Sequence, residues 1–218
     1  MEIIHEDESI VVCYKPAGLA TQTKNIGEKD MESELSNYLK EKGESPEVHV
    51  VHRLDQPVEG VMVFAKNEAA ASKLSRQIAD RSFKKHYYAI ITRESFPEEG
   101  DLVDYLVKDN RTNLSKVVTE NDPRAKKASL TYHTVDRWDD RKLLDIELFS
   151  GRHHQIRIQL ASRTAPILGD VKYGGISTGR SLALCSYSIG FTHPDTGEQV
   201  NYSVKPKGED FLDSKIAT

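Results

Sequence analysis

The order of strand-like and helix-like segments along this chain constrains the fold most, because the strand-like apolar runs do not alternate regularly with the helical segments. The runs predicted as strands are residues 10–14, 48–52, 61–66, 84–93, 127–136 and 142–149. Parallel α/β folds need strands and helices in regular alternation. The sequence therefore predicts an α+β fold with a mixed, largely antiparallel β-sheet and flanking helices.

Three segments have the spacing of amphipathic helices. In residues 30–43, Leu35 and Leu39 share one face with Tyr38, and Gly43 suits the helix end. Asn67 can cap the next helix. In residues 151–163, apolar residues are spaced by four.

Turn residues predict the remaining organisation. "EEGD" (98–101) and "NDPR" (121–124) indicate turns around a less regular middle, and "PILGDVKYGG" (166–175) indicates a loop. The chain ends in two strands around a Pro-Asp-Thr-Gly turn, which predicts a hairpin.

The size and composition favour one intracellular domain. With 218 residues and 38% hydrophobic content, the chain can bury a sizeable core, with room for two lobes. Its acidic start excludes an ordinary secretory signal, and no apolar run approaches the roughly 20 residues of a membrane span. Cys13 and Cys185 lie in strand-like runs, where burial is expected. We expect a cytoplasmic protein with no membrane partner.

The charge is unevenly distributed. Residues 1–47 hold eleven acids and five bases, a net of −6, so the total of −4 leaves +2 for residues 48–218. Residues 76–93 hold five bases against one acid, and residues 151–163 hold three arginines and no acid. Such stripes can bind a phosphate backbone, or they are solvated surface.

Metal and nucleotide motifs are absent. His153 and His154 are adjacent rather than four apart, and His49 and His52 would face opposite sides of a strand. The glycine-rich stretch 174–181 lacks the spacing of a phosphate loop. We expect no metal, although a hydrolase built on His153, His154 and Asp170 is an alternative.

The stretch "VVHRLDQPVEGVMVFAKN" (50–67) draws attention to Asp55. An aspartate before Gln-Pro is commonly a turn residue. Arg53 lies two residues away, however, and a nearby arginine keeps a carboxylate ionised and competent as a nucleophile or base. Both interpretations remain open from the local pattern.

Two long motifs resemble the RluA-type family of RNA pseudouridine synthases. "HRLDQPVEGVMVFAK" (52–66) is similar to the family signature HRLDxxTSGxxxxAK, and "GRHHQIRIQLASRTAPILGDVKYGG" (151–175) is similar to GRxHQIRxxLxxxxxPILGDxxYG. Shorter echoes are "KPAGL" (15–19), "KKHYYA" (84–89) and "FTHP" (191–194), in the family's order. The resemblance covers almost the whole chain.

The resemblance implies a fold with a central active-site cleft and three catalytic residues. Asp55 would be the catalytic nucleophile or base, Tyr87 would pack against the target uracil and assist proton transfer, and Arg157 would pair with Asp55. The reaction breaks the bond between the ribose and the ring nitrogen, turns the uracil and rejoins it through carbon five. The uracil must first leave its stack.

The resemblance also implies an RNA substrate, ribosomal or transfer RNA, and no cofactor. The residues expected to bind substrate are His52, Arg53, Lys84, Lys85, Arg152, His154 and Gln155. We expect a monomer in which residues 1–218 form a single catalytic domain without an N-terminal accessory RNA-binding domain. A protein of the same fold that binds or chaperones RNA without turnover is the alternative.

The chain departs from the signatures at two places. Val58-Glu59 replaces the usual Thr-Ser, and His153 replaces the usual Thr or Ser after Gly-Arg. Glu59 would place a second acid near the RNA path, where it repels phosphate unless it is paired. RNA selection is expected to come from loops 18–30 and 93–125.

Overall fold

The computed structural model describes residues 1–25 and 27–217, which divide into two compact units. The first unit comprises residues 1–84 and 186–206, and the second comprises residues 85–185 with the C-terminal residues from Lys207 onward. Each unit contains its own run of antiparallel strands, so the predicted α+β class is confirmed.

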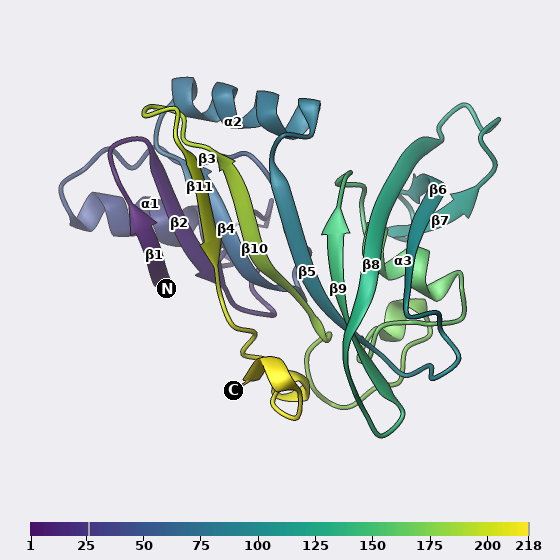
Figure 1. Cartoon of the computed structure of the whole chain (residues 1–218). Coiled ribbons are helices and arrows are strands. Elements are labelled where there is room, and N and C mark those ends of the chain that lie inside the picture. Colours follow the sequence, from purple (N-terminus) through teal and green to yellow (C-terminus); the bar gives the residue numbers. More distant parts are fainter. Residues whose placement is uncertain (26, 218) are drawn as a thin grey trace. The chain divides into compact units, whose positions relative to one another are not determined.

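In the first unit, β1, β2, β4 and β10 lie side by side in that order (Figure 1). β11 pairs antiparallel with β10, and β3 pairs antiparallel with β4. The strands are β1 (Glu2–Glu6), β2 (Ile10–Lys15), β3 (His49–Val50), β4 (Glu59–Ala65), β10 (Leu184–Thr192) and β11 (Gln199–Ser203). The hairpin predicted at the end of the chain is therefore confirmed, with Thr192 opposite Gln199.

Two helices belong to the first unit, α1 (Met31–Glu41) and α2 (Glu68–Asp80). Asp30 and Ser33 form a reciprocal capping box at the start of α1. The Asn67 side chain accepts a hydrogen bond from the Ala70 amide, which confirms its predicted role as a cap. Leu74 of α2 packs on one face of β2, β4 and β10 in a core with Val12, Val63 and Phe191.

The second unit contains antiparallel strands in the spatial order β5, β9, β8, β6, β7. α3 contacts β6, β7 and η1. The strands are β5 (Lys84–Ile91), β6 (Glu99–Asp109), β7 (Leu114–Val118), β8 (Lys126–Trp138) and β9 (Arg141–Leu148). The helices are α3 (Gln155–Ala161), η1 (Val171–Tyr173), η2 (Glu209–Phe211) and η3 (Lys215–Ala217).

The sequence prediction was wrong for the middle of the chain. Residues expected to be irregular form the strands β6 and β7, and the "EEGD" stretch expected to turn includes the start of β6. In β6 the buried Leu102 and Leu106 are separated by acidic and partly exposed residues, so the alternation of a strand is weak. Pairing with β8 along most of its length makes β6 a strand.

Two further differences concern the first unit. β1 was not predicted, and β3 has two residues where five were expected. Beyond Val50 the amide of Val63 donates to the His52 ring instead of to a main-chain oxygen, so the ladder ends there. Both cysteines are buried, and burial raises the pKa of Cys13 to about 12. Within the described residues, no helix is long and apolar enough to cross a membrane.

Candidate active site

The first unit holds Asp55 in a tight turn immediately before β4. The Asp55 carbonyl accepts a hydrogen bond from the Val58 amide at 3.0 Å, and this closes the turn over Gln56 and Pro57. The Asp55 side chain is half-buried. A carboxylate at such a position is held by the backbone yet remains reachable by a ligand.

The residues on both sides of Asp55 are fixed by the 15–21 segment. The Thr21 hydroxyl donates to the Leu54 carbonyl at 3.0 Å and accepts from the Leu54 amide at 3.2 Å. On the other side, the Gln56 carbonyl accepts from the Gly18 amide at 2.8 Å. Asp55 therefore lies between two anchored neighbours.

Lys15 reinforces this anchor from inside the protein. Its side chain is fully buried, and its ammonium donates to the carbonyls of Pro16, Leu19 and Gln56 at 2.9, 2.6 and 3.1 Å. Burial lowers the pKa of Lys15 to about 8, although the charges of Asp55 and Glu59 partly oppose this change. Lys15 thus links the Asp55 turn to the 16–19 loop, a role that only the "KPAGL" echo hinted at in the sequence.

Glu59 does not lie at the surface, which corrects the expectation that it would stand in the path of an RNA. It is 4% exposed and accepts a hydrogen bond from the Tyr14 hydroxyl. The next residue, Gly60, has φ +131°, and a Cβ there would lie 2.2 Å from the Ser186 carbonyl oxygen. The glycine of the signature is thus required by the close approach of β4 to β10.

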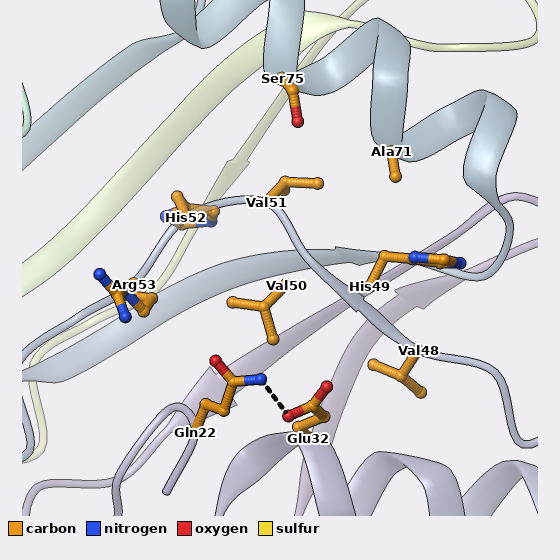
Figure 2. Close-up of a pocket in the computed structure, with 10 residues that line it drawn as sticks. All are labelled: Gln22, Glu32, Val48, His49, Val50, Val51, His52, Arg53, Ala71 and Ser75. Carbon is orange, nitrogen blue, oxygen red and sulfur yellow. Dashed lines mark hydrogen bonds between the residues drawn. The ribbon is translucent and has the colours of Figure 1, made fainter. Parts of the chain in front are cut away.

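His52 and Arg53 border a pocket of about 410 Å³ in the first unit (Figure 2). The His52 Nε2 accepts the Val63 amide at 3.1 Å, which ties the signature to β4. Arg53 is exposed, and its contact with RNA remains a prediction. The other residues that line the pocket are Gln22, Glu32, Val48, His49, Val50, Val51, Ala71 and Ser75.

In the second unit, Tyr87 and Lys85 alternate with more exposed residues of β5, so both point to the same face of the strand. Tyr87 is 6% exposed and Lys85 is 8% exposed. Lys84 is exposed and belongs to the first unit. The five bases of residues 76–93 therefore do not share one environment.

Arg157 is paired with Asp170 inside the second unit. Its Nε and Nη2 donate to the two oxygens of Asp170, each at 2.8 Å, and both side chains are almost completely buried. The guanidinium also lies over the Tyr173 ring, 5.3 Å from its centroid. Asp170 belongs to the "PILGD" part of the second signature, so the signature supplies both partners. Pairing of Arg157 with Asp55 remains a prediction.

Two of the three arginines of residues 151–163 are paired with acids of the protein itself, so the three do not all face an external anion. Besides Arg157, Arg163 donates to both oxygens of Asp104, at 2.9 and 3.2 Å. The acids that the stripe lacks in sequence thus come from β6 and from the 166–175 segment. Arg152 is exposed and, of the three, is the one whose terminal nitrogens meet no acid in the described residues.

His154 and His153 stack on each other, with ring centroids 3.7 Å apart. The Tyr173 hydroxyl accepts from the Ser115 amide at 2.7 Å, so its hydrogen is directed to the His154 Nδ1 at 2.8 Å. Burial, assisted by the charge of Arg157, lowers the pKa of His154 to about 3, which fits a neutral acceptor. Within the described residues, His153, His154 and Asp170 do not have the mutual proximity of metal ligands, and Arg157 donates to both Asp170 oxygens.

Gln155 is buried and holds the loop that carries Arg152. Its Oε1 accepts from the Ser150 hydroxyl at 2.8 Å and from the Arg152 amide at 3.1 Å, and its Nε2 donates to the Ser129 carbonyl at 3.1 Å. These contacts make Gln155 a positioning residue. Direct contact between Gln155 and RNA remains a prediction.

One group of side chains in the described residues, His5, Asp7 and His193, has the proximity of metal ligands. The His193 Nδ1 accepts the Asp195 and Thr196 amides, so its Nε2 carries the hydrogen and donates to Asp7 at 2.8 Å. Although burial opposes it, hydrogen bonds from His5, the Ser9 and Ile10 amides and His193 lower the pKa of Asp7. We interpret this group as a structural anchor.

Comparisons with known proteins all identify RNA pseudouridine synthases as similar to this chain. A family model described as RNA pseudouridylate synthase matches residues 9–162. The chain is 28% identical over 216 residues to Ribosomal large subunit pseudouridine synthase D of Neisseria meningitidis, covering 93% of this chain and 57% of that protein. It is 31% identical over 205 residues to the uncharacterized RNA pseudouridine synthase YhcT of Bacillus subtilis, covering 92% and 67%. The chain thus spans little more than half of the first relative.

Solved structures show the same fold. Human RNA Pseudouridylate Synthase Domain Containing 4 superimposes with a TM-score of 0.78 at 24% identity, covering 94% of this chain and 89% of that one. Human RNA Pseudouridylate Synthase Domain Containing 1 gives a TM-score of 0.74 at 18% identity, covering 94% and 83%. At these identities the likeness concerns the fold alone.

Proposed function

Because the chain belongs to the RNA pseudouridylate synthase family, we propose that it isomerises uridine to pseudouridine in RNA. The substrate class we propose is large-subunit ribosomal RNA, since relatives that match over nine-tenths of this chain carry that RNA in their names. The reaction is a rearrangement within one nucleotide, so it needs no second substrate.

Asp55 is the residue that carries this proposal. Its carboxylate is half-buried in a turn whose neighbours Leu54 and Gln56 are held by Thr21, Gly18 and Lys15. A turn residue with a purely structural role would not need so many independent anchors. A reactive group does need them, because catalysis depends on holding the group within a fraction of an ångström of its target.

The proposed chemistry starts with Asp55 as nucleophile or base at the target nucleotide. The bond between the ribose C1′ and the uracil N1 breaks, the uracil turns in place, and C1′ bonds to C5. The hydrogen at C5 is then lost as a proton while N1 gains one, so that atoms balance. Tyr87 would pack against the uracil, and Arg157 would keep Asp55 charged, as the family signature implies.

RNA must present the uridine outside its stack, and this costs a few kcal/mol that contacts to the backbone have to offset. The exposed Arg53, next to the pocket in the first unit, is one candidate for those contacts. Arg152 in the second unit is another. Both remain proposals.

The test is Asp55→Asn, assayed by tritium release from large-subunit ribosomal RNA transcripts that contain uridine labelled at carbon five. Asparagine is as good a turn residue as aspartate but lacks charge and nucleophilicity. We expect turnover to fall by several orders of magnitude, as for a principal catalytic group. RNA affinity and melting temperature should stay close to those of the wild-type protein.

Two results would contradict the proposal in different ways. Substantial turnover by Asp55→Asn, once deamidation has been excluded by mass spectrometry, would remove Asp55 from the chemistry. Tight RNA binding without tritium release by the wild-type protein, on transcripts that cover the whole large-subunit RNA, would favour an RNA-binding protein of the same fold.

A further inference from the structure

The Lys85 side chain is largely buried, and none of the described residues supplies it with a counter-charge. The residue is 8% exposed, and its ammonium forms no hydrogen bond or ion pair with any residue that the structure describes. The other lysines and arginines that are buried to this degree in the described residues all have partners: Lys15 and Lys142 donate to carbonyls, and Arg157 donates to Asp170. A buried charge without a partner is costly, so its retention calls for an explanation.

The second cation of this cluster is Arg152, on the loop that follows β9. Its Nε donates to the Lys127 carbonyl at 3.1 Å, and its amide is held by Gln155. The two terminal nitrogens of Arg152 have no partner among the described residues. The planar fork is thus oriented by the protein while its outer edge stays open.

Lys85 and Arg152 influence each other directly. Burial and then the charge of Arg152 lower the pKa of Lys85. Gly151, the residue before Arg152, has no Cβ, and a Cβ there would lie 3.4 Å from the Lys85 ammonium. Because residue 151 is a glycine, no side chain at this position occupies the space beside the Lys85 ammonium.

We propose that Lys85 and Arg152 form a binding site for one phosphate of the RNA backbone, beside the nucleotide whose base contacts Tyr87. A guanidinium fork matches two phosphate oxygens, and an ammonium supplies a compact charge to the third. Lys85 and Tyr87 are two residues apart on the same face of β5. A phosphate bound by Lys85 and a base packed against Tyr87 would therefore lie next to each other along this strand. The position of the phosphate relative to the target uridine rests on the proposed function.

The first experiment tests the anion site without using RNA. The Arg152 Nε–H resonance is followed by NMR while inorganic phosphate replaces chloride at constant ionic strength. We expect a saturable shift in the wild-type protein that disappears in a Lys85→Met protein that retains the fold. The control Lys40→Met removes an exposed charge of α1 in the first unit, and should leave the shift unchanged.

The second experiment measures tritium release and RNA binding. Lys85→Met should raise KM about tenfold or more while kcat stays within a few fold, because a backbone contact is present in both the ground state and the transition state. The slope of log affinity against log salt should fall by about one, the loss of one phosphate contact. Lys40→Met should change neither quantity. If Lys85→Met does not fold, Lys85→Gln replaces it.

The outcomes separate this inference from the proposed function. An unchanged phosphate shift in Lys85→Met, together with an unchanged KM and salt slope, overturns the phosphate site even if the wild-type protein is active. A phosphate shift that depends on Lys85, in a protein that releases no tritium, supports an anion site and refutes the proposed activity. A lowered kcat with unchanged KM also overturns the inference, since it would place Lys85 in the chemical step.

Discussion

Removing the charge of Asp170 should destabilise the second unit strongly. In the folded protein the Arg157 guanidinium donates to both Asp170 oxygens at 2.8 Å, and the two side chains are 4% and 1% exposed. Asp170→Asn keeps the shape but removes the carboxylate to which the buried guanidinium donates through Nε and Nη2, and turns an amide NH₂ toward it. Removal of one partner of such a pair costs about 3–5 kcal/mol.

That free energy corresponds to a melting temperature about 10 °C lower for a chain of this length. The assay is urea unfolding followed by tryptophan fluorescence, because Trp138, the sole tryptophan, lies on β8 of the second unit. Glu209→Gln is the matched control, since its pair with Arg180 is exposed on both sides. That change should cost less than about 1 kcal/mol.

The reasoning also predicts the behaviour of a double variant. Arg157→Met with Asp170→Leu replaces both charges by apolar side chains, and should recover most of the stability that Asp170→Asn loses. A loss in Asp170→Asn no greater than that of Glu209→Gln would refute the argument that this buried pair stabilises the unit.

Two further predictions concern the surroundings of Asp55 in the first unit. Gly60→Ala should cost at least about 4 kcal/mol, because the new Cβ would overlap the Ser186 carbonyl at a φ of +131°. Gly43→Ala, at φ +78° in open space, should cost only about 1–2 kcal/mol in the same circular-dichroism melts, and equal losses would contradict the steric argument. Lys15 has a pKa of about 8 in the folded protein against an ordinary 10.5, so the unfolded chain binds its proton more readily between these values. Its contribution to the free energy of unfolding should therefore rise by on the order of 3 kcal/mol from pH 8 to pH 10.5, and urea titrations of Lys15→Met should lack this rise. If the free energy of unfolding changed with pH in the same way in the wild-type and Lys15→Met proteins, the assigned role of Lys15 would be contradicted.

Local pattern determined much of this protein. Asn67 caps α2, Leu35 and Leu39 face inward from α1, and the last two strands form the expected hairpin, because each depends on residues a few positions apart. The two signature motifs were enough to identify Asp55 and Arg157 as candidates, and the shorter echo at 84–89 added Tyr87. The family match over residues 9–162 agrees with that resemblance.

Charge pairing was decided by the tertiary structure. The arginines of residues 151–163 were expected either to bind a phosphate backbone or to be solvated, yet Arg157 and Arg163 form ion pairs with Asp170 and Asp104. No sequence rule links these positions, which are 13 and 59 residues apart. The same is true of Glu59, which looked like an acid in the path of RNA and instead accepts a hydrogen bond from Tyr14.

The sequence by itself determined the class of fold, the family signatures and the position of Asp55 at a turn, because hydrophobic period and turn chemistry act over short distances. Only the tertiary structure decided which cations are satisfied and which are not. It buries Lys15 against three carbonyls, whereas Lys85 is buried without a counter-charge from any residue that the structure describes. The physical reason is that desolvation and pairing depend on what surrounds a side chain in space, and two lysines that look alike in a sequence can meet opposite environments.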